Sequence, residues 1–225
     1  MSELDLTRHM EVFDPAKTIG MRIDVIGDGA VGSRIVRELA RLGVQDIHVW
    51  DFDIIEAHNV PNQDFGLGDI GQKKVDASAE RILRDQGLKI TTHDERVDGS
   101  QPMGNFVFLA VDKMRARKEI FDKGLIFRPH IRGVCELRMG PVSGRIYTFV
   151  PSRPSHISAW QKTISYTDEE AQVSACGSTT TVGATAGLIA VLAVWKFIAV
   201  MTEKPYDNYV LVQANPSSFY SEQWD

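Results

Sequence analysis

The sequence predicts an α/β fold with a doubly wound, mostly parallel sheet, to which an antiparallel portion is added toward the C-terminus. Up to about residue 125, short apolar segments alternate with amphipathic ones. This order is typical of parallel strands joined by crossover helices. Beyond that point, two apolar segments are joined by a short connection rich in glycine, proline and serine, which favours an antiparallel pair.

The first strand and helix are joined by a glycine motif. Gly27, Gly29 and Gly32 lie between an apolar strand at 21–26 and a helix at 31–42 that has apolar residues at helical spacing. The first glycine permits a tight turn, the second lets a phosphate approach the backbone, and the third packs the helix against the strand. The helix N-terminus faces the anion. This pattern predicts a Rossmann-like nucleotide site, and a glycine-rich structural turn is the alternative.

The other elements follow from apolar periodicity and from the breakers at their ends. Further strands are expected at 46–50, 89–94, 106–111, 131–138, 145–150 and 209–213, and helices at 71–86, 113–123 and around 182–194. Residues 1–20 form a polar lead, 54–70 a long connection, and 151–175 a polar crossover loop or partial helix. A chain of 225 residues buries one full-sized core, so a single domain over 1–225 is predicted.

Composition excludes several functional classes. The net charge of -5 and the pI of about 5.7 argue against a protein that coats nucleic acid, because phosphate neutralisation needs a basic face. No secretory signal pattern opens the chain. Cys135 and Cys176 are too few for a disulfide framework or a four-cysteine zinc site. We therefore expect a cytoplasmic protein without zinc, with Cys135 in the core.

One stretch, residues 175–195, carries no charged side chain. A transmembrane helix is one interpretation, but its first half is rich in glycine, serine and threonine, and Lys196 follows it directly. These features favour a buried helix at a subunit interface. Since apolar surface of this kind marks interfaces, we predict a homodimer and no membrane association.

Carboxylates lie at two predicted strand ends. Asp51 ends the second strand about 20 residues after the glycine motif, where a carboxylate accepts hydrogen bonds from ribose hydroxyls. Asp53 points the same way, with a loop cap as the open alternative. Asp112 ends the strand at 106–111, at the crevice where such sheets bind ligands. It could also cap the helix that begins at Lys113, and the two roles are compatible.

Three short segments beyond the second strand carry a resemblance: Asp51-Phe52-Asp53, then Asn59 with Gln63, then Ile70-Gly71 with Lys74. Together they resemble the nucleotide-site signature of the ThiF/MoeB family, the ubiquitin-activating-enzyme-like adenylyltransferases. That signature runs D-x-D, N-x-x-R-Q and I-G-x-x-K-A, and nearly the whole chain resembles compact, single-domain bacterial, plasmid and phage members. The resemblance implies these nucleotide-binding residues: Gly27, Gly29, Gly32, Asp51, Asp53, Asn59, Gln63 and Lys74.

The resemblance also implies ATP and Mg²⁺ as cofactors. Asp112 and Arg117 match a D-x-x-x-x-R motif whose aspartate holds the magnesium of Mg-ATP. Lys74 is placed near a helix N-terminus, from which it can reach phosphate oxygens that gain charge in the transition state. The alternative for Lys74 is a solvated surface lysine, like its neighbour Lys73.

The chain departs from the family pattern at Asn62, where the family has an arginine that contacts the phosphates. A neutral amide cannot replace a guanidinium against a triphosphate. Two cations are candidates for that role. Arg8 resembles the family's N-terminal arginine that enters the partner subunit's site, and Arg34 lies in the first turn of the glycine-loop helix.

Cys176 resembles in its place the cysteine that accepts the activated acyl group in ThiF-like and ubiquitin-activating members. A helix N-terminus would favour its thiolate as a nucleophile. The alternative is a small buried residue at a tight helix start.

The resemblance implies adenylation of the C-terminal carboxylate of a small ubiquitin-like or sulfur-carrier-like protein, with transfer to Cys176 as a further step. One alternative is a non-catalytic member of a heterodimeric activating enzyme that binds nucleotide or carrier, which Asn62 favours. Another is an NAD-dependent oxidoreductase, which the glycine motif and Asp51 fit equally well. The rest of the sequence offers that oxidoreductase no proton donor.

Overall fold

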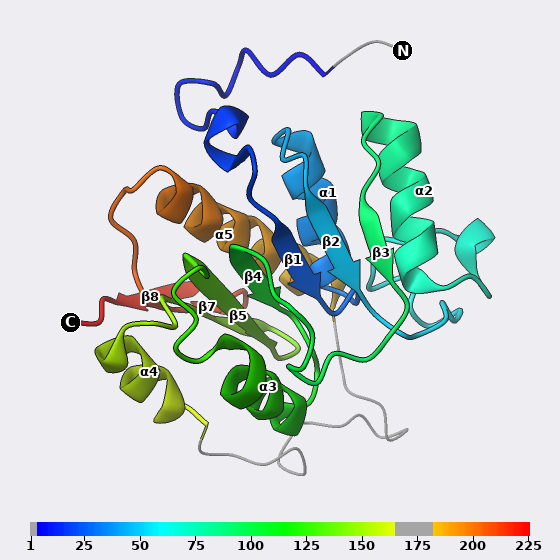
Figure 1. Ribbon diagram of the computed structural model, residues 1–225. Helices are drawn as coiled ribbons and strands as arrows, with labels where there is room; N and C mark the ends of the chain where they lie inside the picture. Colours follow the sequence, from blue (N-terminus) through cyan, green and yellow to red (C-terminus); the bar gives the residue numbers. More distant parts are fainter. Residues whose placement is uncertain (1–3, 165–181) are drawn as a thin grey trace.

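The computed structural model describes residues 4–164 and 182–225. Its centre is one eight-stranded sheet with the order β3-β2-β1-β4-β5-β6-β7-β8 (Figure 1). The strands are β1 (Ile23–Ile26), β2 (Ile47–Trp50), β3 (Thr91–His93), β4 (Phe106–Leu109), β5 (Gly133–Met139), β6 (Ser143–Phe149), β7 (Tyr209–Gln213) and β8 (Ser218–Glu222). In this spatial order, neighbouring strands in the part β3-β2-β1-β4-β5 are parallel, and neighbouring strands in the part β5-β6-β7-β8 are antiparallel. The predicted fold class is confirmed.

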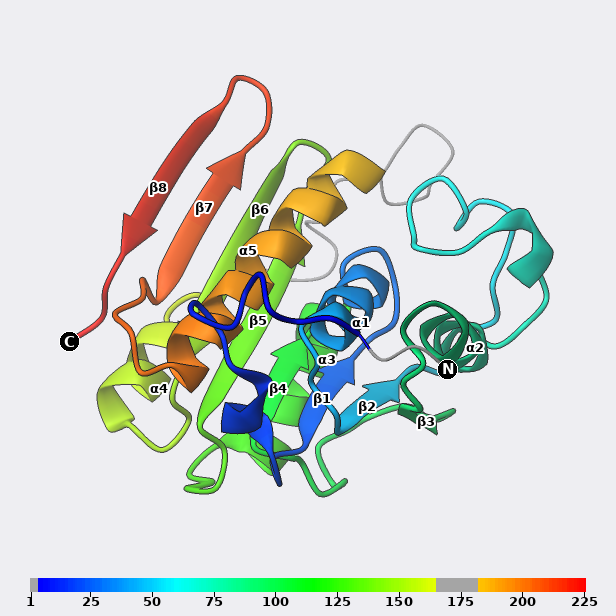
Figure 2. The same ribbon diagram turned by 90° about the horizontal axis from the view of Figure 1, so that it is seen from above.

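Helices cover both faces of the sheet, as a doubly wound fold requires (Figure 2). They are α1 (Gly32–Arg41), α2 (Lys74–Gln86), α3 (Met114–Ile120), α4 (Pro154–Gln161) and α5 (Gly183–Met201). The first hydrophobic cluster joins α1, α2 and α5 to one face, and the second joins α3 and α4 to the other. A short 3-10 helix, Pro15–Thr18, precedes β1, and another, Leu67–Asp69, precedes α2.

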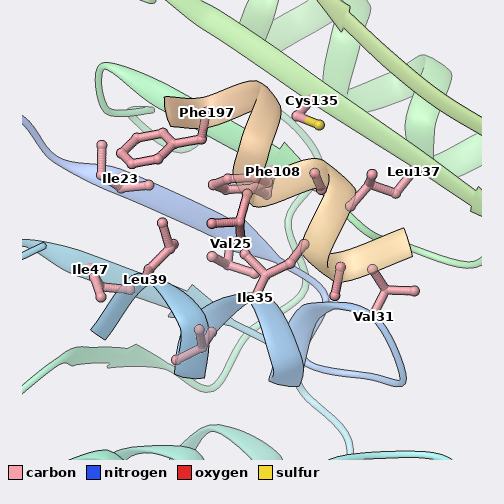
Figure 3. Close-up of a cluster of buried hydrophobic side chains, with 14 of the residues drawn as sticks. Ile23, Val25, Val31, Ile35, Leu39, Ile47, Phe108, Cys135, Leu137 and Phe197 are labelled. Carbon is pink, nitrogen blue, oxygen red and sulfur yellow. The ribbon is translucent and has the colours of Figure 1, made fainter. Parts of the chain in front are cut away.

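The larger core lies between the sheet and α1 and α5. Ile35 of α1, Phe108 of β4 and Phe197 of α5 point toward one another there, with Val25 of β1 between them (Figure 3). All four residues of β1 and all four of β4 are buried. A strand covered on both faces favours a continuous apolar run. Strand β4 has one, and β1 departs from it only at Asp24, whose buried carboxylate accepts hydrogen bonds from Trp50 and the backbone N–H of Gly104.

Helix α5 contains most of the uncharged stretch. It is long and apolar enough to cross a membrane by length and composition alone, and half of its most apolar part is buried inside the protein. Lys196 near its end lies 3.6 Å from Asp207. The outer side of the helix keeps Leu188, Val191 and Trp195 exposed.

The structure departs from the predicted elements in three places. The predicted helix at 71–86 begins only at Lys74, since Gly71 has a φ of 90° and Lys73 pairs with Ile54 in an isolated bridge. The predicted helix at 113–123 starts at Met114 and ends in a π-helical turn, Phe121–Leu125. Strand β8 escaped prediction because all its residues are exposed, and it therefore lacks the alternation of a half-buried strand. Cys135 is fully buried in the core, as expected.

Candidate functional site

The glycine loop connects the end of β1 to the N-terminus of α1. Gly27 has a φ of 94°, and a Cβ at this position would lie 2.8 Å from the carbonyl oxygen of Ala110. A Cβ on Gly32 would lie 1.8 Å from the carbonyl oxygen of Gly27. Around Gly29, no described atom comes within 4 Å of such a position. Packing therefore requires glycine at positions 27 and 32, and Gly29 leaves the backbone open to an approaching phosphate.

Two of the predicted carboxylates meet Lys74 beside this loop. The Nζ of Lys74 lies 2.6 Å from Oδ2 of Asp53 and 3.9 Å from Oδ1 of Asp51. Asp51 also accepts hydrogen bonds from the backbone N–H groups of Asp28, at 2.7 Å, and Asp53, at 2.9 Å. Burial raises the pKa of Asp51, and the nearby Lys74 cation opposes that shift.

Lys74 and Lys73 have opposite environments although they are neighbours in the chain. Lys74 is buried at the first position of α2, whereas the Lys73 side chain is half exposed and pairs with Asp94. The alternative of a solvated surface lysine therefore does not hold for Lys74. A buried ammonium at a helix N-terminus is otherwise disfavoured by the helix dipole, so the two carboxylates, or a bound anion, must offset its charge.

Asp28 is a member of this cluster that sequence reasoning missed. Its side chain is fully buried, its Oδ2 accepts a 2.6 Å hydrogen bond from the Ser78 hydroxyl, and its Oδ1 has no partner among the described residues. Desolvation raises the pKa of Asp28 to about 7, with a smaller contribution from the charge of Asp51, while Ser78 opposes the shift. The sequence feature that could have identified Asp28 is its position between Gly27 and Gly29, inside the glycine loop.

Asn59 and Gln63 lie in the connection between β2 and α2. Asn59 is buried, and its side-chain oxygen accepts a hydrogen bond from the backbone N–H of Glu56. Its backbone carbonyl accepts from Asn62 and Gln63. The side-chain oxygen of Gln63 is buried and has no partner in the described part of the chain. Asn59 therefore stabilises the turn, whereas the role of Gln63 in nucleotide binding stays a prediction.

Arg34 is the cation that the structure brings to Asn62. Its Nη1 donates to the backbone carbonyl oxygens of Ala30, at 2.6 Å, and Asn62, at 2.7 Å. Arg8 is exposed, in a turn whose Leu6 packs at Gly43, beyond the C-terminal end of α1. Within one chain, Arg8 therefore lies at the opposite end of α1 from the glycine loop.

Asp112 follows β4, the strand that lies beside β1. Its side chain is 84% exposed, and its nearest cation is Lys113, at 3.8 Å. Lys113 is the N-cap residue of α3, and its side chain makes no capping hydrogen bond, so the prediction that Asp112 is the N-cap residue was wrong. Mg²⁺ is usually bound by one or two carboxylates together with substrate phosphates. A lone exposed carboxylate at this strand tip fits that requirement.

Arg117 is held in the core and does not face the nucleotide loop. It pairs with the buried carboxylate of Glu136 and donates to the backbone carbonyls of Leu137 and Val111. It thus fixes the end of the strand that leads to Asp112. Cys176 and residues 165–175 of the crossover loop lie outside the described residues.

Comparisons with known proteins agree on one family. The sequence matches the profile described as the ThiF family over residues 15–223. It is 31% identical over 131 residues to the NEDD8-activating enzyme E1 catalytic subunit of Arabidopsis thaliana, covering 51% of this chain and 29% of that protein. The Caenorhabditis elegans protein of the same name is 30% identical over 105 residues, covering 44% of this chain and 24% of its own length. The chain spans less than a third of these relatives.

Solved structures share the fold. The crystal structure of Escherichia coli MccB with ATP superposes with a TM-score of 0.72 at 14% identity, covering 93% of this chain and 65% of that one. The crystal structure of PaaA has a TM-score of 0.72 at 17% identity, covering 98% of this chain and 69% of its own.

Proposed function

Since the chain belongs to the ThiF family, we propose that it binds Mg-ATP and adenylates the C-terminal carboxylate of a small ubiquitin-like or sulfur-carrier-like protein. The observation that carries this proposal is the buried Lys74 with Asp51 and Asp53, beside a glycine loop that has room for a phosphate. Two facts about similar proteins support it. The plant and nematode relatives are activating-enzyme subunits, and MccB has been solved with ATP.

In the proposed reaction, a substrate carboxylate oxygen attacks the α-phosphorus of ATP. The bond between the α- and β-phosphates breaks, pyrophosphate leaves, and an acyl-adenylate remains. The glycine loop and the α1 N-terminus bind the phosphates, Asp51 and Asp53 bind the ribose, and Lys74 offsets charge on the α-phosphate. Asp112 would hold Mg²⁺, which neutralises the charge of the departing pyrophosphate when it is bound.

Arg34 is our candidate for the cation that Asn62 no longer supplies. Two backbone carbonyls fix its guanidinium beside residue 62, and it belongs to the first turn of the helix that faces the phosphates. This placement supports Arg34 over Arg8 within one subunit. Arg8 keeps the role that the family implies, as a residue that enters the partner subunit's site.

A second candidate function is a non-catalytic member of a heterodimeric activating enzyme, because Asn62 lacks the positive charge that turnover needs. Such a member would bind ATP or the carrier without forming an adenylate. We further propose that the active protein is a cytoplasmic homodimer and that Cys176 accepts the acyl group from the adenylate.

The test is ATP–pyrophosphate exchange with candidate carrier proteins, together with ATP and NAD calorimetry. Lys74→Ala should lower ATP affinity and exchange by at least tenfold, because it removes the buried cation next to the phosphates. Lys73→Ala is the matched control and should change neither. Tight NAD binding without ATP binding would reject the proposal, and ATP binding without exchange would favour the non-catalytic member.

A further inference from the structure

A second concave site lies on the antiparallel part of the sheet, away from the glycine loop. It is a cavity of about 520 Å³ between β5, β6, β7, β8, the end of α4 and the C-terminal residues. Its volume is within the range of small-ligand pockets. Pocket residues Tyr147 and Tyr209 belong to the hydrophobic cluster on the α4 side of the sheet, whereas α5 covers the other side (Figure 2).

The wall of this cavity is aromatic and held in place. Tyr147 and Tyr209 are paired across β6 and β7, and their rings stack with centroids 5.0 Å apart at 14°. The Arg138 guanidinium lies over the Tyr147 ring at 4.3 Å. The Trp224 ring lies 6.3 Å from the Tyr147 ring, and the backbone N–H of Trp224 donates to the side-chain oxygen of Asn208 at 2.8 Å. A flat apolar side chain could therefore be bound without reorganising the wall.

The rim of the cavity carries more positive than negative charge, since two cationic side chains line it together with one carboxylate, that of Glu222. Arg145 and Lys162 both line it and are exposed. Neither side chain forms an ion pair with any of the described residues. Arg138, by contrast, is already bound to Glu136 and Thr163. Two uncommitted cations next to an aromatic wall fit a carboxylate that neighbours an apolar or aromatic group.

The cavity is joined to the tip of β4 through one buried ion cluster. Glu136 is fully buried between Arg138, at the cavity, and Arg117. Arg117 also holds the carbonyl of Val111, the residue before Asp112. Adjacent strands lie about 4.8 Å apart, so the cavity over β6 and β7 is roughly 10–15 Å from the β4 tip. An extended peptide crosses that distance in roughly three to five residues.

We propose that this cavity binds an acidic segment of the substrate, roughly three to five residues before the carboxylate that is adenylated. Arg145 and Lys162 contact an acidic side chain, and Tyr147, Tyr209 and Trp224 contact an adjacent aromatic side chain. The inference rests on the proposed function and adds a substrate class to it, namely polypeptides with an acidic and an aromatic residue close to their C-terminus.

The test uses a fluorescein-labelled peptide in which an aspartate–phenylalanine pair is followed by four glycines and a free C-terminal carboxylate. Two control peptides carry asparagine or lysine in place of the aspartate. Fluorescence anisotropy with the full chain should give at least tenfold tighter binding of the acidic peptide. Arg145→Glu and Lys162→Glu should each remove that preference, and Arg145→Lys should retain most of it.

Arg84→Glu is the matched control variant, because Arg84 is an exposed cation on α2, outside the cavity. It should leave the preference unchanged, and circular dichroism should be the same for all variants. Equal binding of the three peptides, or equal loss in Arg84→Glu, would overturn the proposal.

Two measurements separate this inference from the proposed function. ATP calorimetry on Arg145→Glu and Lys162→Glu should match the unmodified protein, because neither residue contacts the nucleotide site. If the unmodified protein binds ATP but shows no preference among the peptides, only the substrate inference fails.

Discussion

At the scale of single residues, Asp28 shows how a carboxyl group can be kept protonated near neutral pH. Among the described residues its side chain has one hydrogen-bond donor, Ser78, and it lies next to a second carboxylate, Asp51. The positive charges of Lys74 and Arg81 lower the pKa of Asp28 but only partly offset its increase. An ionised Asp28 would add negative charge beside the site proposed for phosphate, so its protonated form suits anion binding better.

We predict that Asp28 makes the free energy of unfolding depend on pH. The pKa of Asp28 is about 7 in the folded protein and about 3.9 in the unfolded chain. Between these values the folded state binds more protons, so stability decreases as pH rises from about 4 to 7. Asp28→Asn should be more stable than the unmodified protein at pH 8, by on the order of 2–4 kcal/mol, and similar at pH 4. Urea unfolding at both pH values measures this, and parallel pH profiles would contradict it.

Asp112 and Cys176 should act at different steps of the proposed reaction. Asp112→Ala should abolish pyrophosphate exchange without lowering thermal stability, because the side chain is 84% exposed at a strand tip. Cys176→Ala should keep exchange and lose a thiol-sensitive adduct with the carrier. Full pyrophosphate exchange by the Asp112→Ala variant would contradict the proposal that Asp112 binds Mg²⁺. Unchanged overall transfer in Cys176→Ala would mean that the reaction stops at the adenylate.

At the scale of elements, α5 has two unlike sides. Its inner side packs on the sheet and α1, with Phe197 in the main core. Its outer side exposes Leu188 at 39%, Val191 at 48% and Trp195 at 53%. Contiguous apolar surface of this kind is typical of an interface, and a second copy of the chain is the occupant that we propose.

We therefore predict a dimer in light scattering at micromolar concentration. Trp195→Glu should shift it toward monomer, since burying an unpaired carboxylate in an apolar interface is unfavourable. Leu83→Glu is the matched control, because Leu83 is an equally exposed apolar residue on α2. A monomer before any substitution, or dissociation by Leu83→Glu as well, would argue against α5 as the interface.

At the scale of the whole molecule, the proposed site lies where strand order reverses. β1 has β2 on one side and β4 on the other, so their crossover connections leave in opposite directions and open a crevice at the carboxyl ends. The glycine loop, Asp51 and Asp112 follow these three strands. The antiparallel strands continue the same sheet, so the second cavity and this crevice share one rigid support.

The sequence by itself determined the parallel part of the sheet and the glycine loop. These follow from local rules: apolar strands need apolar residues in a row, and the positive φ and close packing of Gly27 permit no Cβ. The sequence also placed Asp51 and Asp112 at the ends of strands, because that position depends only on where the apolar residues of each strand end. Strand β8 could not be predicted, since an exposed edge strand leaves no apolar pattern.

Only the tertiary structure decided how the chemically active side chains are surrounded. The motif spacing singled out Lys74 over Lys73 but did not give their surroundings: packing buries Lys74 beside two carboxylates and leaves Lys73 half exposed. The placement of Arg34 against Asn62 joins residues far apart in the chain, as does the stacked wall beside Arg145. Charge, burial and partner distance depend on such long-range contacts, and local sequence does not encode them.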